Sequence, residues 1–285
     1  MAPHWLTEKL GRFFTFLTVG FSLGAITGSA VWAADDILRP HRAVYDVVLD
    51  KASDRSGIRA MDGRIVYEMK GSRCEGYAVR FRILMRVQST RRSFTSDQRN
   101  TSFESGDGKT FNFSNQSFLN DQMEMSIQGV ATRTEDGLDV QFSKPAATQI
   151  QLDDAVFLTE HVERLIKGAK NDENIVTTRI YDAGEKGLEL TDTTAIIGKR
   201  QTSVVVKDET PQMNARFEGK DAWSMSISYF AIKQSAVRGE RLPDYQASFI
   251  MQEDGVTRRL KMTYPDYTLR AKLSNLEYFE TAPCD

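Results

Sequence analysis

The chain has 285 residues, of which 40% are hydrophobic and 27% are charged, and its formal net charge is −2 at pH 7. This composition supplies the buried core of one globular domain. The near-neutral charge argues against a general binder of nucleic acid or of anionic membranes, because such proteins concentrate positive charge on one face.

The N-terminus has the pattern of an export signal. Lys9 and Arg12 precede an apolar stretch that Val31-Trp32-Ala33 closes with small residues, as a signal peptidase requires. The stretch is shorter than the roughly 20 apolar residues of a membrane-spanning helix. We therefore expect residues 1–33 to be a cleaved signal peptide. Residues 34–285 would then form a single β-rich domain, soluble in an oxidising compartment outside the cytoplasm.

The chain contains two cysteines, Cys74 and Cys284. In an exported protein an even number of cysteines favours a disulfide over a metal site or a nucleophile. One bridge between them would close a loop of about 210 residues, worth roughly 5 kcal/mol in the chain-entropy estimate. The alternative is a pair of free, buried thiols.

Most of the chain alternates apolar and polar residues with a period of two, which is typical of half-buried strands. The clearest run is Val79–Val87, whose apolar side chains alternate with mostly basic ones. The same alternation recurs in Ala43–Leu49, Met123–Ile127, Leu138–Phe142, Trp223–Tyr229, Tyr245–Met251 and Val256–Tyr264, with Arg258 on the apolar face of the last. Further strands are expected in Asn171–Tyr181, Ala195–Arg200 and Leu269–Phe279.

Asp-Gly pairs separate many of these segments and indicate tight hairpin turns, since glycine tolerates positive φ. The pairs are Asp62-Gly63, Asp107-Gly108, Asp136-Gly137 and Asp254-Gly255. Consecutive strands should therefore pair antiparallel, and the pattern predicts about 12 to 14 of them. Twisted open sheets seldom exceed about ten strands. The predicted fold is mainly β, with one large curved or spiral antiparallel sheet.

One segment changes to the period of an amphipathic helix. Over Asp153–Lys167 the apolar residues recur at helical spacing, with Asp153 or Asp154 as N-cap and Gly168 as the stop. The residues expected to contact the concave side of the sheet are Leu158, Val162, Leu165 and Ile166. Such a helix closes the core or, alternatively, acts as a movable plug over a ligand cavity.

The sequence offers no catalytic residues, metal site or cofactor site. Outside the leader it has two histidines, His41 and His161, which is too few for a multi-histidine metal site. We expect His161 to be a satisfied or exposed histidine beside acidic neighbours. The segment Gly106–Thr110 ends like a phosphate-binding loop but lacks the required earlier glycine, so we interpret it as a hairpin turn.

Two basic runs accompany the strands. Arg80, Arg82 and Arg86 share one strand face, and Arg258, Arg259 and Lys261 lie close together near the C-terminus. A solvated outer face that discourages edge pairing explains both runs. The alternative is an anionic docking surface, for an acidic protein segment or a phospholipid headgroup.

Several segments resemble a known family. They are the opening strand Pro40–Tyr45, the strand Gly63–Glu68 leading to Cys74-Glu75-Gly76-Tyr77, and the terminal Cys284. Together they are similar to the EipB family of cell-envelope integrity proteins. This resemblance implies a periplasmic alphaproteobacterial protein with a spiral-like β-sheet similar to the lipoprotein carriers LolA and LolB. It also implies a disulfide between Cys74 and Cys284.

The resemblance further implies a role in envelope homeostasis and stress resistance, and a functional link to a periplasmic tetratricopeptide-repeat protein. It brings no catalytic residues. We therefore expect a non-enzymatic protein that maintains envelope integrity through protein partners. The alternative is a carrier or sensor of a lipid, a lipoprotein acyl chain or another amphiphile in the cavity of the curved sheet. Its adaptable apolar lining would come from Met123, Met125, Trp223, Met225, Phe249 and Met251.

Overall fold

The computed structural model describes residues 37–184, 186–232 and 242–280. Fourteen strands of this part of the chain form one sheet, in which every neighbouring pair is antiparallel. The expected signal peptide, 1–33, and Cys284 lie outside the described residues. The mainly β fold and the large curved sheet predicted from the alternation are confirmed.

The helices and strands follow one another in the chain as follows. They are β1 (His41–Ala52), a 3₁₀ turn (Asp54–Ser56), β2 (Ile58–Ser72), β3 (Gly76–Ser89), β4 (Ser93–Glu104), β5 (Thr110–Leu119), β6 (Gln122–Thr134), β7 (Gly137–Lys144), β8 (Thr148–Leu152), α1 (Leu158–Lys170), β9 (Ile175–Ile180), β10 (Thr191–Thr202), α2 (Pro211–Ala215), β11 (Asp221–Ala231), β12 (Tyr245–Gln252), β13 (Thr257–Thr263) and β14 (Tyr267–Tyr278).

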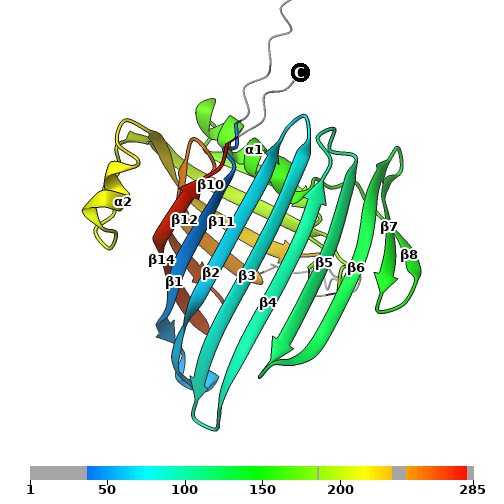
Figure 1. The fold of residues 1–285 in the computed structure, drawn as a ribbon, viewed down its shortest axis with the longest axis horizontal. Helices are drawn as coiled ribbons and strands as arrows, with labels where there is room; N and C mark the ends of the chain where they lie inside the picture. The colour runs from blue at the N-terminus through cyan, green and yellow to red at the C-terminus, as the bar shows by residue number, and fades with distance from the viewer. Residues whose placement is uncertain (1–36, 185, 233–241, 281–285) are drawn as a thin grey trace, which may run out of the picture. The chain divides into compact units, whose positions relative to one another are not determined.

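The sheet consists of two meanders joined where the first strand pairs with the last. Its spatial order is β8-β7-β6-β5-β4-β3-β2-β1-β14-β13-β12-β11-β10-β9. The sheet curls so that β1–β5 lie in front of β10–β12, with α1 near one end of the strands (Figure 1). The two edge strands, β8 and β9, are connected in sequence through α1. After β8 the chain also forms a parallel bridge from Val156 to Ile180 at the end of β9.

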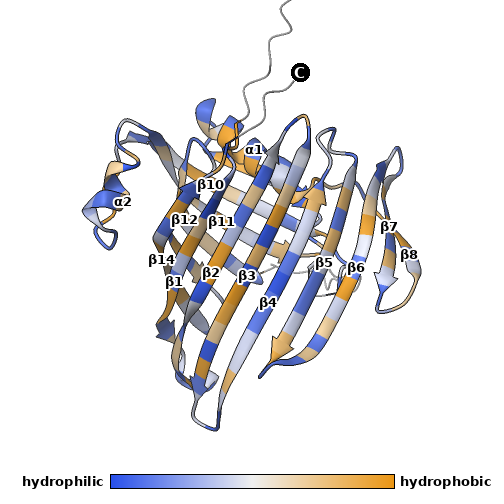
Figure 2. Cartoon of the chain, in the orientation of Figure 1, coloured by the Kyte–Doolittle hydropathy of each residue, from blue (hydrophilic) through white to orange (hydrophobic). Residues whose placement is uncertain are grey.

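Alternation along the strands separates an inner face, which carries the core, from an outer face. Hydrophobic and hydrophilic residues alternate along β1–β3 in Figure 2. On β3 the inward side chains include Met85 and Val87, which are buried, whereas Arg80, Arg82 and Arg86 point outward and are exposed. The apolar face of β3 predicted from the sequence is therefore the face that packs into the core.

Three of the four Asp-Gly pairs lie at hairpin turns, and one prediction was wrong. Asp107-Gly108, Asp136-Gly137 and Asp254-Gly255 connect consecutive strands, whereas Asp62-Gly63 lies inside β2. A Cβ atom on Gly63 would lie 2.1 Å from the carbonyl oxygen of Leu84 on β3. Glycine is needed there because the neighbouring backbone approaches closely, not because the chain turns.

Helix α1 differs from its prediction at both ends. It begins at Leu158 rather than Asp153, and it continues through Gly168 to Lys170. Asp153 and Asp154 therefore lie before the helix and do not cap it. At Gly168 a Cβ would lie 2.8 Å from Cγ2 of Val176, so the glycine permits close packing against β9.

Candidate functional site

The side chains predicted to seat the helix divide between two core clusters. Leu165, 1% exposed, and Ile166 are buried with Trp223 in a cluster on the inner face of β10–β12. Val162 is half-buried against the same cluster. Leu158 is half-buried against a second cluster beneath β5–β7. Helix α1 thus contacts the inner face on both sides of the curled sheet.

The N-terminus of α1 is capped by a carboxylate from a distant strand. Glu104, the last residue of β4, accepts hydrogen bonds from the backbone N–H groups of Thr159 (2.9 Å) and Glu160 (3.1 Å). These donors have no partner within the helix, and the helix dipole favours a negative charge at this end. Burial nevertheless raises the pKa of Glu104, because the carboxylate is removed from water.

Two further polar contacts fasten the helix to the front strands. Arg133 of β6 donates to Glu160 at 2.9 Å, and the hydroxyl of Tyr77 on β3 donates to Glu163 at 3.5 Å. Together with the Glu104 cap, they hold α1 to strands on the opposite side of the fold from β9 and β10. The helix is therefore held in place by both apolar and polar contacts.

Both histidines lie in the interior. The ring nitrogen Nδ1 of His41 lies 2.7 Å from the carbonyl oxygen of Arg39. His161 is buried on the core side of α1, and neither ring nitrogen has a hydrogen-bond partner among the described residues. Burial lowers the pKa of both, that of His161 to about 4. The expectation of a satisfied or exposed His161 was wrong, because this residue faces the sheet and not the solvent.

Only one of the two cysteines of the predicted disulfide, Cys74, lies in the described part of the chain. Cys74 lies in the turn between β2 and β3 and is not a free thiol. Its expected partner, Cys284, is outside the described residues. The pairing of these two cysteines remains a prediction.

The first basic run is partly neutralised by a buried carboxylate. Arg82 of β3 and Arg99 of β4 both donate to Asp97, with N–O distances of 2.8 and 2.7 Å. Burial alone would raise the pKa of Asp97, but the hydrogen bonds from the two arginines outweigh it and hold that pKa below its usual value. Arg82, Arg99 and Asp97 therefore form an ion-pair cluster on this outer face.

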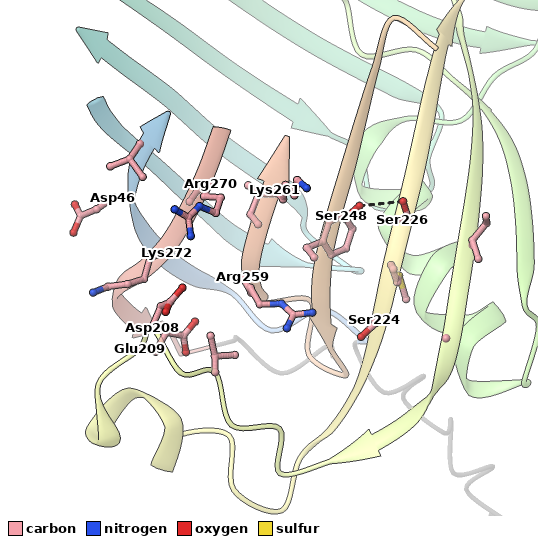
Figure 3. Close-up of a pocket in the computed structure, with 18 residues that line it drawn as sticks. Asp46, Asp208, Glu209, Ser224, Ser226, Ser248, Arg259, Lys261, Arg270 and Lys272 are labelled. Carbon is pink, nitrogen blue, oxygen red and sulfur yellow. Dashed lines mark hydrogen bonds between the residues drawn. The ribbon is translucent and has the colours of Figure 1, made fainter. Parts of the chain in front are cut away.

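A groove of about 1030 Å³ lies on the outer face of β1 and β10–β14. Figure 3 shows it from the outside, with Ser226 and Ser248 hydrogen-bonded to each other in its floor, 3.0 Å apart. Both serines alternate with core residues: Met225 and Phe249 carry their side chains to the inner face. The groove is therefore separate from the interior of the curled sheet.

Strand register places one row of groove residues side by side across six strands. In order from β10 through β14 to β1 these residues are Ile196, Ser226, Ser248, Lys261, Arg270 and Val48. Neighbouring strands lie about 4.8 Å apart, so the row spans about 24 Å. Its centre is polar and basic, whereas both of its ends are apolar.

A bulge in β13 brings the second basic run to this groove. Ile250 pairs with Arg258 and Ser248 with Lys261, so β13 has one residue more than β12 over this stretch. Arg259, within the bulge, has a φ of 49°, which is unusual for a residue other than glycine. The prediction that Arg258 lies on the apolar face with Leu260 was wrong, since the bulge shifts the alternation.

The two bulge arginines have different roles. Arg258 is completely buried and donates to Glu209 (2.8 Å from Nε), to Asn214 Oδ1 (2.6 Å) and to the carbonyl oxygen of Val204 (2.9 Å). These bonds fasten α2 and the segment before it against the outer face, where that segment forms a wall of the groove. Arg259 lines the groove itself.

The charged groups that line the groove are unequally paired. Asp46 pairs with Arg64 at 2.9 Å, Arg270 with Asp50 at 2.9 Å, and Glu209 with Arg258. The lining side chains without an ion pair to any described residue are Arg259, Lys261, Lys272 and Asp208. The net charge of these four side chains is therefore positive. Burial raises the pKa of Glu209, against the effect of Arg258.

These features define a class before any comparison: an open, curled antiparallel sheet with an inner helix and an outer groove. Within the described ranges, no helix has the length and apolar character to cross a membrane. The family model described as EipB-like matches residues 33–280. The chain belongs to the EipB-like family.

A relative and a solved structure agree with this assignment. The chain is 36% identical over 268 residues to the cell envelope integrity protein EipB of Brucella abortus, covering 93% of this chain and 91% of that protein. It is also similar to the crystal structure of a beta-barrel-like protein, of the domain of unknown function DUF1849, from Brucella abortus. That match has a TM-score of 0.79 and 35% identity, and covers 86% of this chain and all of the other.

Proposed function

We propose that this protein maintains cell-envelope integrity as a non-enzymatic periplasmic protein. The observation that carries the proposal is the similarity to the Brucella abortus protein over nearly the full length of both chains. Similarity of this extent includes the helix, the sheet and the turn with Cys74, so the two proteins share a whole fold and not a local motif. Export through residues 1–33 and a disulfide between Cys74 and Cys284 belong to the proposal.

The placement of the histidines supports the non-enzymatic part. A general base must reach a substrate proton directly or through one water molecule. His41 and His161 are both buried, at 2% and 4% exposure. Both side chains serve the core instead. We propose that the protein acts by binding partners, among them a periplasmic tetratricopeptide-repeat protein, and that it contributes to envelope-stress resistance.

The residues considered for an interior amphiphile site support core packing instead. Trp223, Met225, Phe249 and Met251 belong to the buried cluster that receives α1. Met123 is 55% exposed, because a bulge between β5 and β6 interrupts the alternation there. We therefore favour the partner-binding function over a carrier with its ligand inside the sheet.

Deletion of the gene in the native organism tests this function. The deletion strain should lose resistance to deoxycholate and EDTA, and a plasmid copy of the full chain should restore it. The matched control is the same plasmid without codons 2–33, whose product should stay in the cytoplasm and fail to restore resistance. Unchanged resistance of the deletion strain to both agents would contradict the proposal.

A further inference from the structure

The outer groove is built by specific features of the sequence. The extra residue in β13 carries Arg259 into the groove, and the left-handed backbone of a non-glycine residue is energetically unfavourable. The buried Arg258, with its bonds to Glu209 and Asn214, fixes the wall. Strain and a buried ion pair are both expensive to maintain, so their coincidence at one groove points to a use for it.

The charges of the groove select an anionic ligand. Lys261 and Arg270 lie directly opposite each other on β13 and β14, and like charges in that position repel. Lys272 lies two residues further along β14, where the β13–β14 pairing has ended. Asp50 compensates Arg270, and Lys272 lies opposite Asp46 and interacts electrostatically with Glu209, but Arg259 and Lys261 have no ion-pair partner among the described residues. A ligand with several anionic oxygens would relieve this repulsion.

The two ends of the groove are apolar, so a ligand that fills it needs an apolar part as well as an anionic one. Ile196, at one end of the row, is 59% exposed and lines the groove. Gly198 contributes no side chain to this end, which leaves room above β10. Val48, at the other end, is 47% exposed. Inorganic phosphate would occupy the basic centre alone and leave both apolar ends in water.

We propose that this groove binds a phosphate-headed amphiphile. The phosphate lies between Arg259 and Lys261, which offer charge-assisted hydrogen bonds to its oxygens. The hydroxyls of Ser226 and Ser248 border the same centre. The apolar chain runs over Ser226 toward Ile196. This site lies on the opposite face of the sheet from α1, and it goes beyond the proposed role in envelope integrity.

Titration calorimetry on the mature protein tests the proposal with short-chain, monomeric probes. Dihexanoylphosphatidic acid should bind at least tenfold more tightly than inorganic phosphate, because it alone covers the apolar end. It should also bind more tightly than dihexanoylphosphatidylcholine, whose head is neutral overall. Hexaglutamate, an acidic peptide without an apolar chain, should bind more weakly than the phosphatidic acid.

Three variants locate the site. Lys261→Gln should weaken the binding of dihexanoylphosphatidic acid about tenfold or more, as expected for loss of a charge-assisted hydrogen bond. Ile196→Ser should weaken binding of the same probe but leave the affinity for inorganic phosphate unchanged. The matched control is Arg91→Gln, which removes an exposed cation from the β3–β4 turn and should change neither. Thermal unfolding of each variant confirms that it is folded.

Specific outcomes would overturn the proposal. Equal affinities for phosphatidic acid and inorganic phosphate would reduce the site to a simple anion site. Tighter binding of hexaglutamate than of any lipid would replace the lipid with an acidic protein segment. Equal effects of Lys261→Gln and Arg91→Gln, or no binding of phosphatidic acid by the folded wild type, would remove the groove as a lipid site altogether. None of these results depends on the envelope phenotype.

Discussion

Removing one side chain beneath α1 should measure how strongly the helix is held to the inner face. The substitution Leu165→Ala deletes three carbon atoms from a side chain that is 1% exposed in the cluster with Trp223. The position is enclosed by α1 on one side and by β10–β12 on the other. The sheet backbone is held by its hydrogen-bond ladders, so the resulting cavity should collapse only in part.

The magnitude follows from that burial. Leu→Ala at well-packed core positions costs about 2–5 kcal/mol, of which the cavity is a substantial part. For Leu165 we expect about 3 kcal/mol. In a domain of this size each 1 kcal/mol lowers Tm by roughly 2–4 °C, so the expected decrease is roughly 6–12 °C. The matched control is Ile175→Ala on β9, whose side chain is 64% exposed and should change Tm by only about 1 or 2 °C.

The assay is thermal unfolding followed by circular dichroism, with urea unfolding to give the free energy. Similar m-values for wild type and both variants would show that the unfolded states are comparable. The reasoning would be refuted if Leu165→Ala shifted Tm no more than Ile175→Ala. That result would mean that α1 is not held by its apolar side.

Three other predictions concern the cysteines, one histidine and one arginine. Cys74→Ser and Cys284→Ser should each lower the free energy of unfolding by about 2–5 kcal/mol, with no further loss in the double variant, and a linked peptide should appear on non-reducing digestion; free thiols in the native protein would contradict this. Because burial lowers the pKa of His161 from 6.5 to about 4, the unfolded state takes up the proton first, and stability should fall by about 3 kcal/mol as the pH decreases from 6.5 to 4. His161→Phe should flatten that part of the stability profile, and an identical slope in both proteins would exclude His161 as its source. Arg258→Met should cost about 3–5 kcal/mol in urea unfolding by leaving Glu209 unpaired, against about 0–1 kcal/mol for Arg64→Met at an exposed pair; equal costs would refute the buried network.

The sheet could be predicted from sequence because its physical basis is local. Alternation along β3 shows directly which side chains face inward, and three Asp-Gly pairs give the hairpins. Where a glycine serves packing between strands, as Gly63 does, the same sequence signal is misleading. The distinction depends on the backbone of Leu84, which is 21 residues away in the sequence.

The ends of α1 could not be predicted, since the group that caps the helix comes from another element. Glu104 lies 55 residues before Thr159, and no local pattern connects them. Asp153 and Asp154 were acceptable N-caps by residue type alone. Tertiary contact decided where the helix begins.

The outer groove was visible in the sequence only as a basic run. Alternation predicts that Arg258 and Leu260 share a face, and the bulge at Arg259 reverses that arrangement. Two consecutive arginines inside a strand pattern were the available signal, because one of them must either face the core or leave the alternation. The segment containing Glu209, which pairs with Arg258, gave no pattern at all.

Replacement of EipB in Brucella abortus tests the central claim most directly. A strain lacking its own EipB should regain deoxycholate resistance when it expresses the present chain with residues 1–33. The variant Leu165→Asp, which places an unpaired carboxylate in the core beneath α1, should accumulate poorly and fail to restore resistance. If the wild-type chain reached the periplasm at the level of native EipB and resistance did not return, the claim that this protein maintains envelope integrity would be contradicted.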